Sequence, residues 1–340
     1  MEKTKILVTG GTGYIGSHTV VELQQSGYEV VIVDNLSNSR ADVVDHIEQI
    51  TGIRPAFEQV DCLDYEGLDA VFRKYPHVKG VIHFAASKAV GESVQKPLMY
   101  YRNNLGSLIN LLELMPKHGV EGIIFSSSCT VYGQPDVLPV TESAPIKKAE
   151  SPYGNTKQVN EEIIRDFVAS GASINAILLR YFNPIGAHPT ALIGELPNGV
   201  PQNLVPYVTQ TAAGIRQQLS VFGNDYDTPD GSCIRDYIYV VDLAKAHVVA
   251  MERILNHKQA EQVEVFNVGT GHGVSVLELV NAFERATGVK LNYQIVGRRA
   301  GDIEKIWANP ERANKVLGWY ADTPLEDILA SAWKWQCTLS

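Results

Sequence analysis

Cysteine is scarce in this chain, and long apolar runs are absent. The 340 residues include only four cysteines, at positions 62, 129, 233 and 337, and none lies in a CxxC spacing. This usage predicts neither a disulfide framework nor a zinc site, so we expect no bound metal. No apolar run is long enough to span a bilayer, and we expect no membrane partner. A glycine-rich turn begins almost at Met1, which predicts that no signal peptide precedes it and that the protein is cytoplasmic.

An excess of positive charge is also lacking. Acidic residues outnumber basic ones by 38 to 29, and the formal net charge is -9. Nucleic acid is therefore not an expected partner, although a few local arginines can still hold one small anionic molecule. Hydrophobic residues make up 45% of the chain and charged residues 20%, which is typical of a folded protein with a sizeable core.

The N-terminal stretch has the pattern of a nucleotide-binding turn. Residues 6–8 predict a buried strand, and residues 15–25 predict a helix; between them the chain carries Gly10, Gly13 and Gly16. Such glycines allow a sharp turn, close approach to a pyrophosphate, and close packing of helix on strand. The next predicted strand ends at Asp34, whose carboxylate can accept ribose hydroxyls and would repel a 2′-phosphate. The pattern predicts NAD binding; the alternatives are a plain glycine turn and a solvated acid at a strand end.

Strands and helices alternate over the first half of the chain. Further strands are predicted at 29–33, 56–60, 80–84, 122–125 and 174–182, and helices at 65–75, 97–118 and 152–169. This alternation predicts an α/β fold, a Rossmann-type doubly wound parallel sheet. We expect residues 1–183 to form the NAD-binding domain, with a strand and helix returning from about 235–270. Residues 184–340 are richer in proline and are expected to form mainly a smaller mixed α/β substrate lobe. Short strands are predicted there at 237–240, 263–268 and 291–296, and helices near 242–255 and 275–287.

Tyr153 and Lys157 lie four residues apart on a predicted helix and share one of its faces. An ammonium near a phenol, helped by the positive nicotinamide ring, favours the phenolate, so Tyr153 is a candidate general acid and base. The helix follows the fifth predicted strand, at the sheet edge where doubly wound folds bind ligands. A second YxxxK, from Tyr75 to Lys79, contains a proline and a strand start, and we interpret it as chance. The alternative for Tyr153 is a packed surface tyrosine.

Three serines at 126–128 follow the predicted strand 122–125. They are either a polar strand exit or hydrogen-bond partners for a substrate hydroxyl, and spacing does not say which one acts. No histidine pairs with them as in a nucleophile triad, which disfavours a hydrolase. His83 follows an apolar strand and is expected to be a satisfied core residue. The second lobe contains arginines that are either surface charges or a diphosphate clamp: Arg235, Arg298 and Arg299.

Over nearly its whole length the chain resembles the UDP-glucose 4-epimerase family of extended short-chain dehydrogenases/reductases. The most specific stretches are Lys88-Ala-Val-Gly-Glu-Ser-Val-Gln-Lys-Pro97 and Phe222-Gly-Asn-Asp-Tyr226. The glycine turn and Ser151-Pro-Tyr-Gly154 are shared more widely, and Arg298-Arg299 with Gly301-Asp302 also matches. The resemblance implies NAD as cofactor, a UDP-sugar as substrate, and a homodimer formed through helices 97–118 and 152–169.

The resemblance further implies that UDP-glucose and UDP-galactose interconvert by oxidation at carbon 4, turnover of the 4-keto sugar, and hydride return to its opposite face. Tyr153 would take the proton of the 4-hydroxyl, Ser128 would hydrogen-bond the same oxygen, and Lys157 would hold the nicotinamide ribose and tune Tyr153. By the family pattern the NAD site is lined by Gly10, Gly13, Tyr14, Ile15, Gly16, Asp34, Asn35, Leu36, Asn38, Ser39, Asp61, Cys62, Phe84, Ala85, Ala86, Lys88, Asn103, Ser128, Tyr153, Lys157 and Phe182. The UDP-sugar site is lined by Lys88, Ser128, Tyr153, Asn183, Asn203, Leu204, Val221, Phe222, Arg235, Arg299, Asp302 and Ile306.

Ile306 departs from the family pattern in an informative way. Some members restricted to glucose and galactose have a bulky tyrosine there, and members that also accept N-acetylhexosamines have a small residue. Isoleucine is intermediate in bulk, and we therefore hypothesise an additional activity on UDP-N-acetylhexosamines.

Three other functions compete with epimerisation. A 4,6-dehydratase of the same superfamily places Asp-Glu just after its Ser/Thr, whereas this chain has Cys129-Thr130. A net oxidoreductase is not excluded by the spacing, but the specific stretches match epimerases and favour epimerisation. A non-enzymatic NAD-binding protein would typically lack the pair of Tyr153 and Lys157, and fold alone does not decide between these functions.

Overall fold

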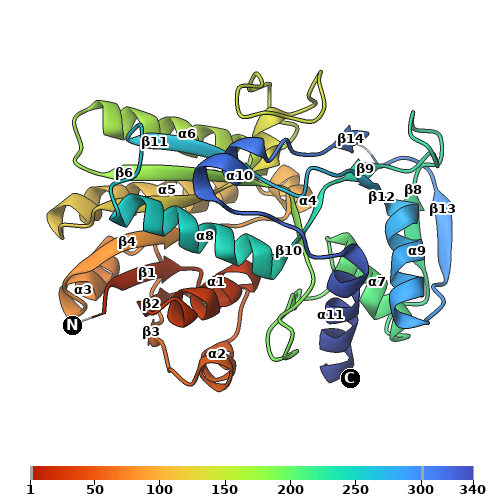
Figure 1. Ribbon diagram of the computed structural model, residues 1–340, viewed down its shortest axis with the longest axis horizontal. Coiled ribbons are helices and arrows are strands. Elements are labelled where there is room, and N and C mark those ends of the chain that lie inside the picture. Colours follow the sequence, from red (N-terminus) through yellow and green to blue (C-terminus); the bar gives the residue numbers. More distant parts are fainter. Residues whose placement is uncertain (1–2, 300–301, 340) are drawn as a thin grey trace.

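The computed structural model describes residues 3–299 and 302–339 (Figure 1), so Gly301 of the family motif lies outside the described residues. A central sheet of seven strands has the order β11-β6-β5-β4-β1-β2-β3. Neighbouring strands are parallel throughout this sheet. Its strands are β1 (Lys5–Thr9), β2 (Glu29–Val33), β3 (Ala56–Glu58), β4 (Val78–His83), β5 (Gly122–Ser128), β6 (Asn175–Tyr181) and β11 (Val263–Val268). The predicted doubly wound parallel sheet is confirmed.

Helices cover both faces of the sheet (Figure 1). One layer holds α1 (Tyr14–Gln25), α2 (Val43–Thr51) and α8 (Val240–Leu255), and the other holds α3 (Tyr65–Lys74), α5 (Pro97–Lys117) and α6 (Pro152–Ala169). Strand β1 shows why this arrangement forms. Ile6 and Val8 pack in the first layer and Leu7 in the second, so an uninterrupted apolar run is needed to bury both faces.

Two short helices in this half were not predicted, namely α4 (Val90–Gln95) and the 3-10 helix η1 (Cys129–Tyr132). Strand β5 also differs from the prediction, because it continues through the serines to Ser128 instead of ending at residue 125. All three serine side chains have partners that suit a buried strand, as described below. Ser128, the serine predicted for the site, is therefore positioned by strand pairing and not by a loop, because it lies in register with Tyr181 of β6.

The C-terminal half is built from short strands and helices beside the carboxyl edge of the sheet (Figure 1). Its strands form small sheets: β7 (Asn183–Ile185) with β10 (Tyr237–Tyr239), β8 (Leu219–Phe222) with β13 (Tyr293–Val296), and β9 (Ile234–Arg235) between β12 (Val274–Ser275) and β14 (Lys305–Ile306). Its helices are α7 (Leu204–Ala212), α9 (Val276–Thr287) and α11 (Leu325–Thr338), whereas α10 (Glu311–Leu317) packs against α8 and β11 of the central sheet (Figure 1).

The chain returns to the central sheet after entering this half. Strand β11 pairs with β6, and α8 packs in the same layer as α1. The division of the chain into two domains at residue 183 stays a prediction. Within residues 3–299 and 302–339, no helix is long and apolar enough to cross a bilayer.

Candidate active site

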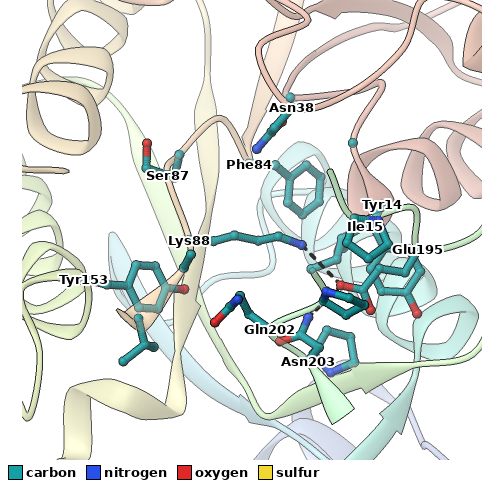
Figure 2. A pocket seen from close by; sticks show the side chains of 18 of the residues that line it. Tyr14, Ile15, Asn38, Phe84, Ser87, Lys88, Tyr153, Glu195, Gln202 and Asn203 are labelled. Atoms are coloured by element: carbon teal, nitrogen blue, oxygen red, sulfur yellow. Dashed lines mark hydrogen bonds and ion pairs between the residues drawn. The ribbon is translucent and has the colours of Figure 1, made fainter. Parts of the chain in front are cut away.

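A cleft of about 2120 Å³ runs along the carboxyl ends of the sheet strands and between them and the C-terminal half (Figure 2). Nearly all the residues predicted for the NAD and UDP-sugar sites line this cleft, and two lie outside its wall. Leu36 turns the chain with a positive φ of 59°, and its N–H donates to Asp34. Val221 is buried in the core because side chains alternate along β8, and it is Phe222 that reaches the cleft.

The glycine turn is packed too tightly for any other residue. Gly10 has a φ of 71°, and a Cβ there would lie 2.9 Å from the backbone nitrogen of Ala85 at the end of β4. A Cβ at Gly16 would lie 2.1 Å from the carbonyl oxygen of Gly10. Gly13 is the N-cap of α1, and in the described part of the chain no side chain caps this helix. Its first N–H groups are therefore open to the cleft, and the turn fits a dinucleotide pyrophosphate.

Asp34 sits where an adenosine ribose is expected. Only 7% of this residue is exposed, at the end of β2. Its carboxylate accepts hydrogen bonds from Thr12 N–H at 3.2 Å, from Leu36 N–H at 2.9 Å and from the Ser39 hydroxyl at 3.1 Å. A carboxylate can accept about four hydrogen bonds, so these fix its orientation and leave capacity for a ribose hydroxyl. Nearby, Asn35 donates to Asp61 at 2.9 Å.

The three predicted catalytic residues come together on the opposite side of the cleft. Ser128 ends β5, and Tyr153 lies in the first turn of α6, which begins with Pro152 and is capped by the Ser151 side chain on Gly154 N–H at 3.1 Å. Lys157 is one turn further along, with its Nζ 5.9 Å from the centre of the Tyr153 ring. The Lys157 ammonium donates to the carbonyl oxygen of Ser126 at 2.6 Å, which fixes the side chain in place.

In the protein without bound cofactor, burial is the main influence on the pKa values of Tyr153 and Lys157. It raises the pKa of Tyr153 well above its ordinary range, and a hydrogen bond with Ser128 acts in the opposite direction. Burial also lowers the pKa of Lys157 to about 8, against the attraction of Glu161. Desolvation is the largest cause of the raised Tyr153 pKa, so without a cofactor the phenol holds its proton. The expectation that Lys157 and a positive nicotinamide ring together favour the phenolate concerns the NAD-bound protein and stays a prediction.

The serine run divides into structural and cleft-facing members. The Ser126 hydroxyl hydrogen-bonds with the Tyr181 hydroxyl, and the Ser127 hydroxyl donates to Glu161 at 2.6 Å. Ser128 accepts from Thr130 N–H at 3.2 Å and lines the cleft beside Tyr153. Ser126 also lines the cleft, but its hydroxyl is paired with Tyr181, which favours Ser128 as the serine that meets a substrate. His83 is a core residue as predicted, hydrogen-bonded to the Thr9 hydroxyl at 2.7 Å, and burial lowers its pKa to about 3.

On the UDP-sugar side, two of the three arginines line the cleft. Arg235 on β9 donates to its neighbouring backbone at 2.8 Å, and Arg299 donates to Asp302 at 2.6 Å. Arg298 instead pairs with Asp225 at 2.7 Å and stacks on the ring of Tyr226, outside the cleft wall. Ile306 on β14 is buried against Phe182 and Cys129.

Sequence reasoning missed an acid in this wall. Glu195 lies between Lys88 and Asn203 (Figure 2), accepting from Asn203 Nδ2 at 2.6 Å. Nothing in its spacing distinguishes Glu195 from a surface acid, because Lys88 is far away in sequence and Asn203, eight residues on, lies in a proline-rich stretch with no predicted element. Only the arrangement of three separate segments places it in the cleft.

A glycine turn at the start of a parallel sheet, with a Ser–Tyr–Lys group at the same edge, defines an extended short-chain dehydrogenase/reductase. The chain belongs to the NAD dependent epimerase/dehydratase family, whose model matches residues 6–269.

Named relatives are similar over nearly the whole chain. A UDP-glucose 4-epimerase from Bacillus subtilis is 53% identical over 331 residues, covering 97% of this chain and 96% of that protein. A crystal structure of UDP-glucose 4-epimerase from Bifidobacterium longum, in complex with NAD+ and UDP, has a TM-score of 0.94, 48% identity and 98% coverage of both chains. A UDP-Glc/GlcNAc 4-epimerase from Campylobacter jejuni has a TM-score of 0.83 and 35% identity, covering 98% of this chain and 99% of that one.

Proposed function

We propose that this chain is an NAD-dependent UDP-glucose 4-epimerase, which interconverts UDP-glucose and UDP-galactose. The observation that carries the proposal is the meeting of Ser128, Tyr153 and Lys157 with the glycine turn in one cleft. That cleft also contains Asn203, Arg235 and Arg299, which supply donors for a diphosphate and uridine. The high similarity to named epimerases over nearly the full length supports the same activity.

Each catalytic residue has a role that follows from its place. When bound, NAD supplies the acceptor and donor of the hydride at carbon 4 of the sugar. The Tyr153 phenolate takes the proton from the 4-hydroxyl, and the resulting phenol later returns it to the 4-keto oxygen. Ser128 donates a hydrogen bond to the same oxygen, and the Lys157 ammonium favours the phenolate while held by Ser126. Burial raises the Tyr153 pKa in the protein without cofactor, and the positive nicotinamide ring of bound NAD would favour the phenolate.

Proton NMR of UDP-glucose with purified protein and no added cofactor tests the proposal. Growth of UDP-galactose signals to an equilibrium mixture is expected, because the cofactor is regenerated in each turnover and stays bound. If no UDP-galactose signal grows, even after addition of NAD, the proposal fails, and a net oxidoreductase or a non-enzymatic NAD-binding protein becomes the better interpretation.

We also propose activity on UDP-N-acetylglucosamine. Ile306 lines the cleft and is smaller than tyrosine, which supports room beside carbon 2 of the sugar. The similarity to a UDP-Glc/GlcNAc 4-epimerase agrees with this. The same NMR assay at high enzyme concentration is the test: if UDP-glucose reacts and UDP-N-acetylglucosamine does not, the idea fails.

Finally, we propose that the protein works in the cytoplasm as a homodimer. Helices α5 and α6 pack side by side, and α5 carries the exposed apolar side chains Leu98 and Ile109, which supports an interface there. Sedimentation equilibrium tests the dimer, and a monomer across micromolar concentrations contradicts it.

The four cysteines are all free thiols, three of them buried, which supports the proposed cytoplasmic location, because the cytoplasm is a reducing compartment.

A further inference from the structure

Glu195 connects the two sides of the cleft. Its side chain is 11% exposed, and its Oε1 lies 3.6 Å from Lys88 Nζ and 2.6 Å from Asn203 Nδ2 (Figure 2). Lys88 belongs to the segment between β4 and α4 and is predicted for both the NAD site and the UDP-sugar site. Asn203 directly precedes α7 and is predicted for the UDP-sugar site. One carboxylate therefore contacts two residues predicted for the UDP-sugar site, from separate segments of the chain.

The backbone around Glu195 is held rigidly. His188 N–H donates to Ile193 O at 3.1 Å, and a β-bridge joins Ala187 to Gly194. The indole of Trp335 on α11 donates to the carbonyl oxygen of Glu195 at 3.0 Å. A side chain at Gly194 would collide with that indole, since its Cβ would come within 2.5 Å. The carboxylate thus projects into the cleft from a fixed point.

Asn203 is the N-cap of α7, yet it does not cap the helix. Its backbone, with φ -92° and ψ 150°, has the extended conformation of a capping residue, and asparagine is among the strongest caps. Nevertheless, in the described ranges no side chain caps α7, and the Asn203 amide is bound to Glu195 instead. Leu204 and Val205, the first two residues of the helix, both line the cleft. Their N–H groups, at the positive end of the helix dipole, are left for a ligand.

We propose that Glu195 is a positioning residue for the UDP-sugar, holding the Asn203 amide away from the start of α7 so that the helix N–H groups remain open to the diphosphate. This inference rests on the proposed function. An amide nitrogen has two hydrogens, so Asn203 can donate one to Glu195 and the other to a phosphate oxygen. Lys88 offsets the negative charge that Glu195 would otherwise present to an anionic ligand. Its ammonium side chain is 54% exposed, so the pair itself adds little to stability.

UDP titration by calorimetry, with the NAD-loaded protein, tests the role without relying on turnover. In Glu195→Ala the Asn203 side chain is released to cap its own helix and competes with the ligand. We expect UDP affinity to fall about 10-fold, as for loss of a hydrogen bond to a charged group, with KM for UDP-glucose rising equally and kcat almost unchanged. Glu195→Gln keeps an acceptor for Asn203, and we expect it to bind UDP within about 3-fold of wild type.

Glu150→Ala is the matched control. It removes a carboxylate from the rim of the same cleft, and Glu150 has no hydrogen bond or ion pair within the described residues. We expect UDP affinity and KM to stay at wild-type values in this variant. A loss equal to that of Glu195→Ala would mean that net charge, and not the contact with Asn203, sets the affinity, which overturns the proposal.

A double-mutant cycle separates positioning from other roles. Because Glu195 acts through Asn203, the variant carrying Glu195→Ala and Asn203→Ala should bind UDP no more weakly than Asn203→Ala alone. Additive losses overturn the proposal, as does an unchanged or tighter affinity in Glu195→Ala, which would mark the carboxylate as purely repulsive. If Glu195→Ala does not fold, a 10-fold loss in Glu195→Gln likewise overturns it. A wild-type protein that binds UDP but fails to epimerise UDP-glucose refutes the proposed function and leaves this role standing.

Discussion

The buried pair of Arg180 and Glu161 allows a quantitative prediction for stability. Their side chains are 4% and 6% exposed, and the guanidinium binds both carboxylate oxygens, at 2.5 Å and 2.8 Å. Ser127 donates to the same carboxylate at 2.6 Å, one residue before Ser128, which is proposed to be catalytic. Arg180→Met leaves Glu161 buried without its cation. We expect the free energy of unfolding to fall by about 3–5 kcal/mol, which is the usual cost of breaking a buried pair from one side.

Urea unfolding at a fixed, saturating NAD concentration is the assay. With a slope of about 3 kcal/mol/M, the loss moves the midpoint down by about 1 M or more. Replacing both partners, in Glu161→Leu with Arg180→Met, removes the uncompensated charge, so this variant should recover most of the lost stability. A loss below about 1 kcal/mol in Arg180→Met would refute the reasoning. So would a double variant less stable than Arg180→Met alone.

Three further predictions concern the site. Tyr153→Phe should lower kcat about 10²- to 10⁴-fold while bound NAD per chain, measured after denaturation, is unchanged; loss of NAD instead would assign the residue to cofactor binding. In NAD-free protein, burial lowers the pKa of Lys157 from 10.5 to about 8, so the unfolded chain binds this proton more tightly between those values. Stability should therefore rise with pH across that window, and thermal melts of Lys157→Met should lack this rise. Gly16→Ala should lose bound NAD, because its Cβ would lie 2.1 Å from the Gly10 carbonyl oxygen; full occupancy would contradict the tight turn.

The first half of the fold could be predicted because its signals are local. The glycine turn, the run at 6–8 and Asp34 each lie within a few residues of the element they define, and the structure has β1, α1 and β2 there. Tyr153 and Lys157 were found for the same reason, since helical spacing puts them on one face. The end of β5 was predicted too early, because three consecutive serines are typical of the polar residues that follow a strand. Their burial depends on Tyr181 and Glu161, which no local pattern reveals.

In the second half β10, β11, β13, α8 and α9 were predicted, and the remaining elements were missed for a different reason. Helix α7 contains Pro206 at its third position, where a missing N–H costs nothing, yet in the sequence this proline reads as an interruption. Strands β9, β12 and β14 are each two residues long and exist only because they pair with one another. Helices α10 and α11 were also not predicted. The position of Glu195 in the cleft depends on contacts with Lys88 and Trp335, which are far from it in the chain.

The return of β11 to the central sheet has a consequence for engineering. Strand β6 lies between β5 and β11, so a fragment that stopped at residue 183 would expose the whole edge of β6. Such a fragment would also lack α8, leaving the apolar side of α1 uncovered. An unpaired, apolar edge is a template for aggregation. Exchange of substrate-recognition segments between relatives therefore needs more than one splice point. When segments are exchanged, the stretch from β10 to β11 should stay with the central sheet that it completes. The segments before and after this stretch can then be replaced separately without exposing the core.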